Sequence, residues 1–403
     1  MDKKTKPIAD RKLLGIAGAA WMFDALDVGM LSFIIAALKM EEGWNLTDVQ
    51  AGWIGSTQSI GMAVGALLFG AMADKVGRKN ILIITLLLFS VGSGLSALVG
   101  TVSLFLILRF FIGMGLGGEL PVASTLVSES VAPSKRGRVV VLLESFWALG
   151  WILSALISYF IIPAYGWRIA LILSALPAFY AVYLRFSLPD SPKYEELKPK
   201  EKQSMLQNMK KVWAKEYSKQ TLILWVLWFC VVFSYYGMFL WLPSVMLMKG
   251  FSLIKSFEYV LIMTLAQLPG YFTAAWFIEK MGRKFVLITY LIGTAASAYF
   301  FGTAEELPLL ITSGILLSFF NLGAWGALYA YTPEQYPTVI RGTGAGMAAA
   351  IGRIGGILGP LLVGYLVAAN TSISMIFTIF TVAILIGVIA VAFGKETKNT
   401  VLE

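Results

Sequence analysis

The 403-residue sequence contains no histidine and a single cysteine, Cys230. Histidine is the usual proton carrier near neutral pH and the commonest metal ligand, so its absence excludes His-based metal sites and catalytic triads. One cysteine cannot form an intramolecular disulfide. Any proton chemistry must therefore use carboxylates, and we expect the protein to hold neither a metal nor a cofactor.

Charged side chains are also scarce. They make up 14% of the residues against 58% hydrophobic ones, and the mean hydropathy is +0.77. A soluble domain has about 25% charged and about 45–50% apolar residues. This composition excludes cytosolic enzymes and nucleic-acid-binding proteins, and it predicts a membrane protein.

Long apolar runs account for this composition. A helix that crosses a bilayer needs about 20 mostly apolar residues, and twelve such runs follow one another along the chain. Their approximate limits are 14–38, 50–74, 80–99, 102–129, 138–161, 167–187, 220–248, 256–279, 284–302, 307–332, 343–368 and 372–394. The sequence therefore predicts an all-α membrane protein with twelve transmembrane helices. The first run carries Asp24 and Asp27 and lacks a clear cleavage site, so we expect a retained span rather than a signal peptide.

The basic residues predict the orientation of these spans. With a cytoplasmic N-terminus, most of the 32 Lys and Arg residues fall on the cytoplasmic side, and only Lys39, Lys249 and Lys255 lie in external loops. Cytoplasmic loops carry such an excess of positive charge. We therefore expect both termini in the cytoplasm of a cell with this protein in its plasma membrane. The net charge of +9 is then a topology signal, and no nucleic-acid partner is expected.

A polar, Lys-rich stretch at 189–219 divides the spans six and six. It predicts a cytoplasmic linker, with a short helix around Met205–Val212, between an N-terminal bundle (1–188) and a C-terminal bundle (220–403). Its lysines could contact anionic lipid, but a solvated tether with the positive charge expected on the cytoplasmic side is the favoured explanation. We expect a functional monomer surrounded by lipid.

Two motifs recur at one fixed distance. The segment Asp74–Lys79 after the second span recurs as Glu279–Lys284 after the eighth, 205 positions later, with Lys, Gly, Arg and Lys in matching places. The same offset relates Glu129 to Glu334, and Arg136 to Arg341. Two motifs that share one offset indicate two pseudo-symmetric six-helix halves, which are the parallel repeats of an alternating-access transporter.

These motifs resemble the major facilitator superfamily. Arg109–Gly117 in the fourth span is also similar to that family, and Pro189–Pro192 and Glu396–Lys398 resemble its sugar-porter-like branch. The resemblance supports a gating role for the repeated charges, because they could hold one face shut in one state and separate in the other. A role confined to topology and helix packing is the alternative. The candidate gating residues are Asp74, Gly77, Arg78, Glu129, Arg136, Glu279, Gly282, Arg283, Glu334 and Arg341.

Three ionisable residues are expected near the middle of the bilayer. At 1.5 Å per residue, Asp24, Asp27 and Arg353 lie ~15–20 Å along their helices within a core ~30 Å thick. A charged side chain at this depth costs about 2.5–3.5 kcal/mol on insertion scales, so each is a functional candidate. We expect Asp27 to couple a proton, with Arg353 as a possible partner, and Asp24 to be a weaker candidate. A fixed salt bridge between the halves is the alternative.

Three further residues are candidates for proton transfer. Glu119 and Glu144 lie in the fourth and fifth spans, where they could relay protons or pair with basic residues such as Arg136. Arg109 resembles the residue that is linked to proton transfer in this family, although packing next to Gly113 would also explain it.

Aromatic residues of the seventh and tenth spans could form a substrate site. Aromatic walls together with a guanidinium suit a small planar anion, since the rings stack on the ligand and the guanidinium binds its carboxylate. Ordinary packing between helices is the alternative for any single ring. The candidate substrate-binding residues are Arg353, Tyr235, Tyr236, Trp325, Asn321 and Gln267.

A finer resemblance agrees with this chemistry. Phe23–Phe33 is similar to the first span of aromatic acid/proton symporters, except that Ala25 replaces their usual Gly, and Gly352–Pro360 resembles their eleventh span. Tyr235–Pro243 resembles the bacterial niacin transporters. The resemblance implies proton-coupled uptake of a small aromatic monocarboxylate, with nicotinate the first candidate and benzoate-like acids the next.

Other functions fit less well. A sugar symporter needs many neutral donors and acceptors, and the interiors of the fifth and seventh spans contain no Gln or Asn. A drug antiporter should have a Gly-Pro motif in the fifth span, where Gly150 is not followed by proline. Arg353 argues against an organic-cation carrier. A non-transporting receptor on the same fold remains open, whereas an enzyme lacks a nucleotide loop and a nucleophile pair.

Overall fold

The computed structural model describes residues 10–76, 78–130, 136–180, 183 and 205–398. Within these ranges the chain is built from helices, and none of the described residues forms a strand. Lipid offers no hydrogen bonds to the backbone, so a spanning segment must satisfy its own N–H and C=O groups, as a helix does.

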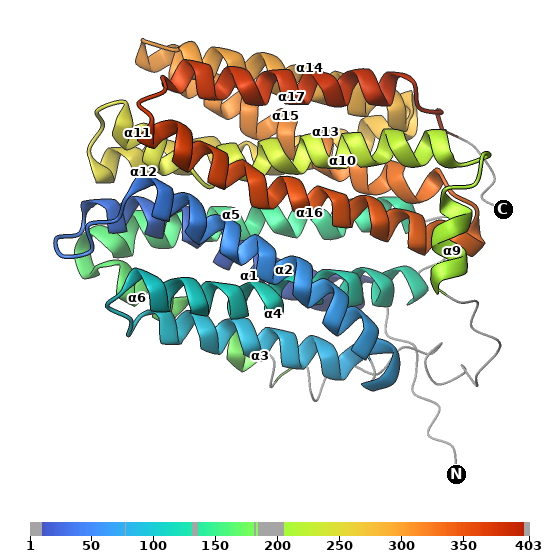
Figure 1. Cartoon of the computed structure of the whole chain (residues 1–403), viewed down its shortest axis with the longest axis horizontal. Coiled ribbons are helices and arrows are strands. Elements are labelled where there is room, and N and C mark those ends of the chain that lie inside the picture. The colour runs from blue at the N-terminus through green and yellow to red at the C-terminus, as the bar shows by residue number, and fades with distance from the viewer. Residues whose placement is uncertain (1–9, 77, 131–135, 181–182, 184–204, 399–403) are drawn as a thin grey trace.

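The helices form two groups (Figure 1). In the first group α1 packs against α5, while α2 and α3 both pack against α4. In the second group α10 packs against α16 and α17, and α14 packs against α15. The first group contains α1 (Asp10–Met40), α2 (Asp48–Val76), α3 (Arg78–Ser96), α4 (Val102–Ser130), α5 (Arg136–Tyr165) and α6 (Trp167–Leu173). The second contains α10 (Ser218–Phe239), α11 (Leu242–Met248), α12 (Leu253–Leu265), α13 (Gln267–Met281), α14 (Arg283–Thr303), α15 (Leu307–Glu334), α16 (Thr338–Ala368) and α17 (Ile373–Ala392).

Where the structure describes the chain, each expected span contains helix. Eight helical stretches among the described residues are long and apolar enough to cross a membrane. Shorter apolar helices at Asn80–Ser96, Val102–Gly117 and Trp167–Tyr180 match three further expected spans, and the expected span 50–74 lies in α2. A short helix, α9 (Met205–Val212), confirms the one expected in the linker.

The seventh and eighth expected spans are each broken, which the hydropathy pattern did not predict. The run 220–248 is divided between α10 and α11, with Pro243 in the first turn of α11. The run 256–279 is divided between α12 and α13 at Ala266, three residues before Pro269. Proline lacks the N–H that continues a helical ladder, so the break falls just before it and the proline sits in the next first turn.

The two groups pack closely at the end of the molecule that contains Lys39, Asp48 and Trp241, called here the Asp48 end. The Ser56 hydroxyl of α2 donates to the Ile357 carbonyl of α16 at 2.6 Å. The Lys39 ammonium lies 5.3 Å from the centre of the Trp241 ring. A Cβ atom on Gly52 would be 2.9 Å from the Pro360 carbonyl oxygen. Only a residue without a side chain allows α2 and α16 to approach this closely.

Candidate substrate, proton and gating sites

Asp27 is held by a cluster of polar side chains inside the first group of helices. Its carboxylate on α1 accepts hydrogen bonds from Nη1 of Arg109 on α4 at 3.3 Å and from Nε2 of Gln58 on α2 at 3.4 Å. It also accepts one from the hydroxyl of Ser93 on α3. The Arg109 guanidinium lies 4.8 Å from the Phe105 ring centre, a favourable cation–π arrangement. Four helices thus converge on one buried carboxylate.

The pairing expected between Asp27 and Arg353 is wrong. The guanidinium that pairs with Asp27 belongs to Arg109, and both side chains are almost completely shielded, at 1% and 0% exposure. Asp24 and Asp27 do share a helix, but positions i and i+3 are ~60° apart around it. That rotation is enough to direct Asp27 into its own bundle, whereas Asp24 interacts electrostatically with Tyr236 of the second group.

Arg353 lies between the two groups. Its Nη1 atom on α16 is 3.5 Å from the Tyr236 hydroxyl of α10 and 3.7 Å from the Met62 sulfur of α2. Among the residues that the structure describes, no carboxylate forms a salt bridge with Arg353. A half-buried guanidinium without a carboxylate partner is suited to bind an anionic ligand.

Aromatic rings of both groups form a continuous wall beside Arg353. Tyr235 contacts Tyr236 and Trp325, with ring centres 5.2 and 4.8 Å apart. The Tyr235 hydroxyl accepts a hydrogen bond of 2.7 Å from the indole N–H of Trp147 on α5. Trp325 also contacts Tyr329, 5.9 Å away. The structure thus brings Tyr235, Tyr236 and Trp325 together, and Trp147, which the sequence did not single out, ties them to the first bundle.

Several buried polar atoms around this wall lack a hydrogen-bond partner in the described part of the chain. Buried polar groups are nearly always satisfied, so such orphans need an explanation. In a binding site, the missing partner can be the ligand. They include the side chains of Glu144, Gln267 and Asn321 Oδ1, the Tyr271 hydroxyl, and the indole N–H groups of Trp21 and Trp325.

Five residues at these sites were not predicted from the sequence: Gln58, Ser93, Trp21, Trp147 and Tyr271. Gln58 is an amide inside an apolar run, which is a signal that could have identified it. Trp21, Trp147 and Tyr271 gave no such signal, because aromatic residues are common in membrane helices. Only their positions in the folded structure distinguish them.

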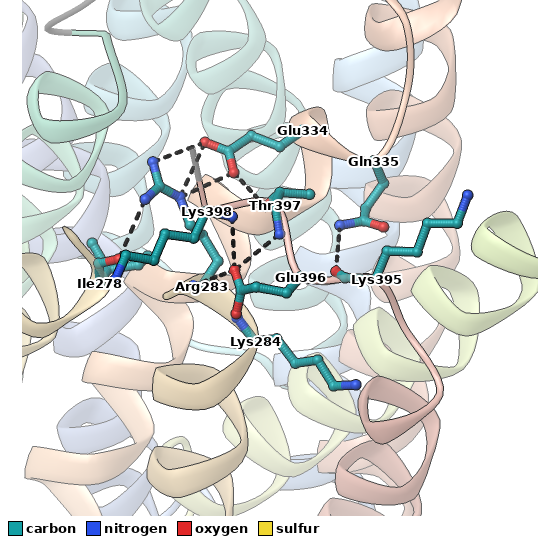
Figure 2. Close-up of polar contacts among 9 residues, drawn as sticks. All are labelled: Ile278, Arg283, Lys284, Glu334, Gln335, Lys395, Glu396, Thr397 and Lys398. Carbon is teal, nitrogen blue, oxygen red and sulfur yellow. Dashed lines mark hydrogen bonds and ion pairs between the residues drawn. The ribbon is translucent and has the colours of Figure 1, made fainter. Parts of the chain in front are cut away.

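The second repeat of the charged motif forms a network at the end opposite Asp48, called here the Glu334 end (Figure 2). Nε of Arg283 is 3.0 Å from the Glu334 carboxylate, which also accepts a 2.5 Å bond from the Thr397 hydroxyl. The Glu396 carboxylate accepts the backbone N–H groups of Arg283 and Lys284 at 2.9 and 3.0 Å. Glu396 therefore caps the N-terminus of α14, where unpaired N–H groups and the helix dipole favour an anion.

Gly282 makes this cap possible. Its φ of 101° is strained for other residues, and a Cβ atom there would be only 2.5 Å from the Glu396 carboxylate. Glu396 is an addition to the candidate gating residues.

The other gating candidates are placed differently. Arg341 donates from Nε to the Pro333 and Tyr336 carbonyls at 3.1 and 3.3 Å. Glu279 is exposed and lines a cavity of about 310 Å³ between α5 and α13. The structure does not describe Gly77, nor the side chains of four further gating candidates and of one proton-transfer candidate, Glu119. The four gating candidates are Asp74, Arg78, Glu129 and Arg136.

Comparison with known proteins decides the family. The sequence model of the Major Facilitator Superfamily matches residues 18–270 and 259–402. The chain belongs to the major facilitator superfamily. It is therefore a multi-pass membrane transporter and not an enzyme, as the sequence predicted.

Two bacterial members of the superfamily are similar to the chain over almost its whole length. The putative niacin/nicotinamide transporter NiaP of Bacillus subtilis is 69% identical over 401 residues, which cover 99% of this chain and 100% of that protein. The niacin transporter NiaP of Acinetobacter baylyi is 44% identical over 420 residues, covering 97% and 95%. The resemblance to the niacin transporter branch is thus confirmed.

A solved structure confirms the superfamily's twelve-helix fold. The partially occluded, inward-open conformation of the xylose transporter XylE from E. coli aligns with a TM-score of 0.79 and covers 98% of this chain and 99% of that one. The two sequences are 17% identical, so the likeness concerns the fold alone.

Proposed function

We propose that this protein imports niacin, as the nicotinate anion, together with protons across the plasma membrane. The observation that carries the proposal is the position of Arg353, a guanidinium without a carboxylate partner in the described structure, beside Tyr236 and between the two bundles. Nicotinate offers a carboxylate for this guanidinium and a flat ring for the adjoining wall of Tyr235, Tyr236 and Trp325. Two relatives, a putative niacin/nicotinamide transporter at 69% identity and a niacin transporter at 44%, support the same class of substrate.

Asp27 is the proposed coupling group. Protonation of its carboxylate would remove the charge that Arg109 binds and weaken the 3.3 Å contact. Because Gln58 and Ser93 also bind this carboxylate, the proton would rearrange contacts among α1, α2, α3 and α4. Protonation could thereby bias the arrangement of the first bundle. Asp24 links this helix to the substrate site through its interaction with Tyr236.

We propose alternating access by the segments 1–188 and 220–403, joined by 189–219, in a functional monomer with lipid around it. Close packing at the Asp48 end supports a state that is closed there. The Glu334 end would face the cytoplasm together with both termini, as the distribution of basic residues suggests. The Arg283–Glu334–Glu396 network lies entirely within the second segment, so it would hold that segment together at this end while the two segments move apart and close.

Uptake by purified protein in proteoliposomes tests the proposal. Labelled nicotinate should accumulate in response to an inward proton gradient, and excess unlabelled nicotinate should block it while glucose should not. Nicotinamide, which lacks the carboxylate, should compete less well if Arg353 binds the anion. Transport of benzoate or a sugar in place of nicotinate would overturn the substrate assignment, and binding without any flux would indicate a receptor.

A further inference from the structure

Glu144 is a carboxyl group that the proposed transport cycle leaves unexplained. It lies on α5 with 1% exposure, and neither carboxylate oxygen has a hydrogen-bond partner among the described residues. The indole N–H groups of Trp21 on α1 and Trp325 on α15 are donors within reach of it, but neither forms a hydrogen bond of normal geometry. A carboxyl group that only joined these helices would be expected to form well-aligned bonds with those donors.

Glu144 and Arg353 are connected through the same aromatic wall. Tyr329 interacts electrostatically with both of them, and its ring contacts Trp325, which lies beside Glu144. Glu144 and Arg353 form no salt bridge with each other, so they do not neutralise one another directly. Glu144 and Arg353 are therefore two separate polar groups beside one aromatic wall.

The surroundings of Glu144 favour its neutral form as a hydrogen-bond donor. No cation pairs with it in the described structure, and indole and phenol rings surround it. An isolated ionised carboxylate is very costly to bury in apolar surroundings, whereas the neutral acid is much cheaper and carries an O–H group. That O–H group needs an acceptor, and the ligand is a candidate to supply it.

We propose that Glu144 forms a hydrogen bond with the ring nitrogen of the substrate and so selects pyridine carboxylates over benzene carboxylates. This inference rests on the proposed function, because it assumes that Arg353 binds the carboxylate of nicotinate. The Glu144 carboxyl group donates to the lone pair of the ring nitrogen, while the aromatic wall accepts either kind of ring. A benzene ring leaves that buried donor without an acceptor, and a site built for a polar contact rejects an analogue that lacks it.

Competition against labelled nicotinate uptake by the wild-type protein is the first test, and it needs no variant. Benzoate should inhibit ~10–100-fold less well than nicotinate, as expected for the loss of one buried hydrogen bond. N-methylnicotinate should also be a weak competitor, because its ring nitrogen has no free lone pair. Equal inhibition by nicotinate and benzoate would overturn the inference while the proposed function stands. An absence of nicotinate uptake would overturn both.

Two variants, Glu144→Leu and Glu144→Gln, test whether this residue causes the preference for nicotinate over benzoate. Glu144→Leu should reduce the ~10–100-fold preference for nicotinate over benzoate to within ~3-fold, mainly by weakening nicotinate. Glu144→Gln should preserve most of the preference, because the amide can still donate a hydrogen bond. The matched controls are Glu42→Leu and Glu42→Gln, at an exposed loop position. An unchanged preference for nicotinate over benzoate in Glu144→Leu would contradict the inference. It would also be contradicted if Glu144→Gln lost gradient-driven uptake while its competition profile stayed the same. That second result would indicate a proton relay instead.

Discussion

The Asp27 carboxylate and the Arg109 guanidinium form a salt bridge of 3.3 Å in which both side chains are shielded from solvent. Protonation of Asp27 would leave the buried guanidinium without a compensating charge, although the carboxyl group keeps its shape. The pair is therefore suited to respond to a proton.

Asp27→Asn should abolish accumulation of nicotinate against its gradient while exchange of labelled for unlabelled substrate continues. Asparagine resembles the protonated acid in shape but cannot release a proton. The measurement is uptake with and without a proton gradient, together with counterflow in its absence. Asp48→Asn, which alters the carboxylate paired with Lys39 at the Asp48 end, is the control. Normal accumulation by Asp27→Asn would refute its coupling role.

Arg353→Ala should weaken nicotinate binding by at least ~10-fold, because hydrogen bonds to charged groups contribute about 1.5–3 kcal/mol. The protein should still fold, since the guanidinium is half-buried and no carboxylate among the described residues pairs with it. Binding can be measured by scintillation proximity in detergent and folding by size-exclusion chromatography. Arg168→Ala, at an arginine whose side chain is 43% exposed, is the matched control. Unchanged affinity in Arg353→Ala would remove this residue from the site.

Tyr236→Phe and Tyr235→Phe should have different effects. The Tyr236 hydroxyl lies 3.5 Å from Arg353, so its loss should weaken nicotinate binding a few-fold, corresponding to about 0.5–1.5 kcal/mol for one hydrogen bond. The Tyr235 hydroxyl accepts from Trp147, and its loss leaves a buried indole N–H unpaired at a cost of about 1–3 kcal/mol. Tyr235→Phe should therefore lower the melting temperature more than Tyr236→Phe does. Equal melting temperatures and affinities in the two variants would contradict this assignment.

Arg283 and Glu334 should be coupled energetically. Their side chains are only 20% and 14% exposed, and residues within one network show interaction energies of about 0.5–3 kcal/mol in double-mutant cycles. The cycle consists of Arg283→Ala, Glu334→Ala and the double variant, with thermal unfolding in detergent as the readout. The exposed pair Lys255–Glu258 is the control and should show no measurable coupling. Additive effects of Arg283→Ala and Glu334→Ala would show that the network does not stabilise this end.

Gly52→Leu should slow transport by disfavouring closure of the Asp48 end. A Cβ atom at this position would be 2.9 Å from the Pro360 carbonyl oxygen, and overpacking costs about 1–3 kcal/mol. This corresponds to a shift of about 5- to 150-fold in the population of the closed state. Gly100→Leu is the matched control, because nothing lies within 4 Å of a Cβ atom there. Wild-type uptake rates in Gly52→Leu would show that this contact does not have to form during the cycle.

The sequence alone determined the spans, the family resemblance and the ionisable residues worth testing. Twelve apolar runs predict twelve helices because a backbone in lipid must satisfy its own hydrogen bonds. The cost of a charge in the bilayer identifies Asp27 and Arg353 without any coordinates. Pro243 and Pro269 also mark the places where the seventh and eighth spans are broken. The hydropathy of these spans did not reveal the breaks.

Only the tertiary structure decided which of these residues meet. Asp27 pairs with Arg109, from a helix 82 positions away, and not with Arg353, because a rotation of ~60° around α1 separates the directions of Asp24 and Asp27. The neighbours of Glu144 and the link from Trp147 to Tyr235 depend in the same way on how α1, α5, α10 and α15 are packed. Hydropathy fixes that a helix crosses the membrane, but its rotation about its own axis is set by side-chain packing between helices, which the linear pattern does not record.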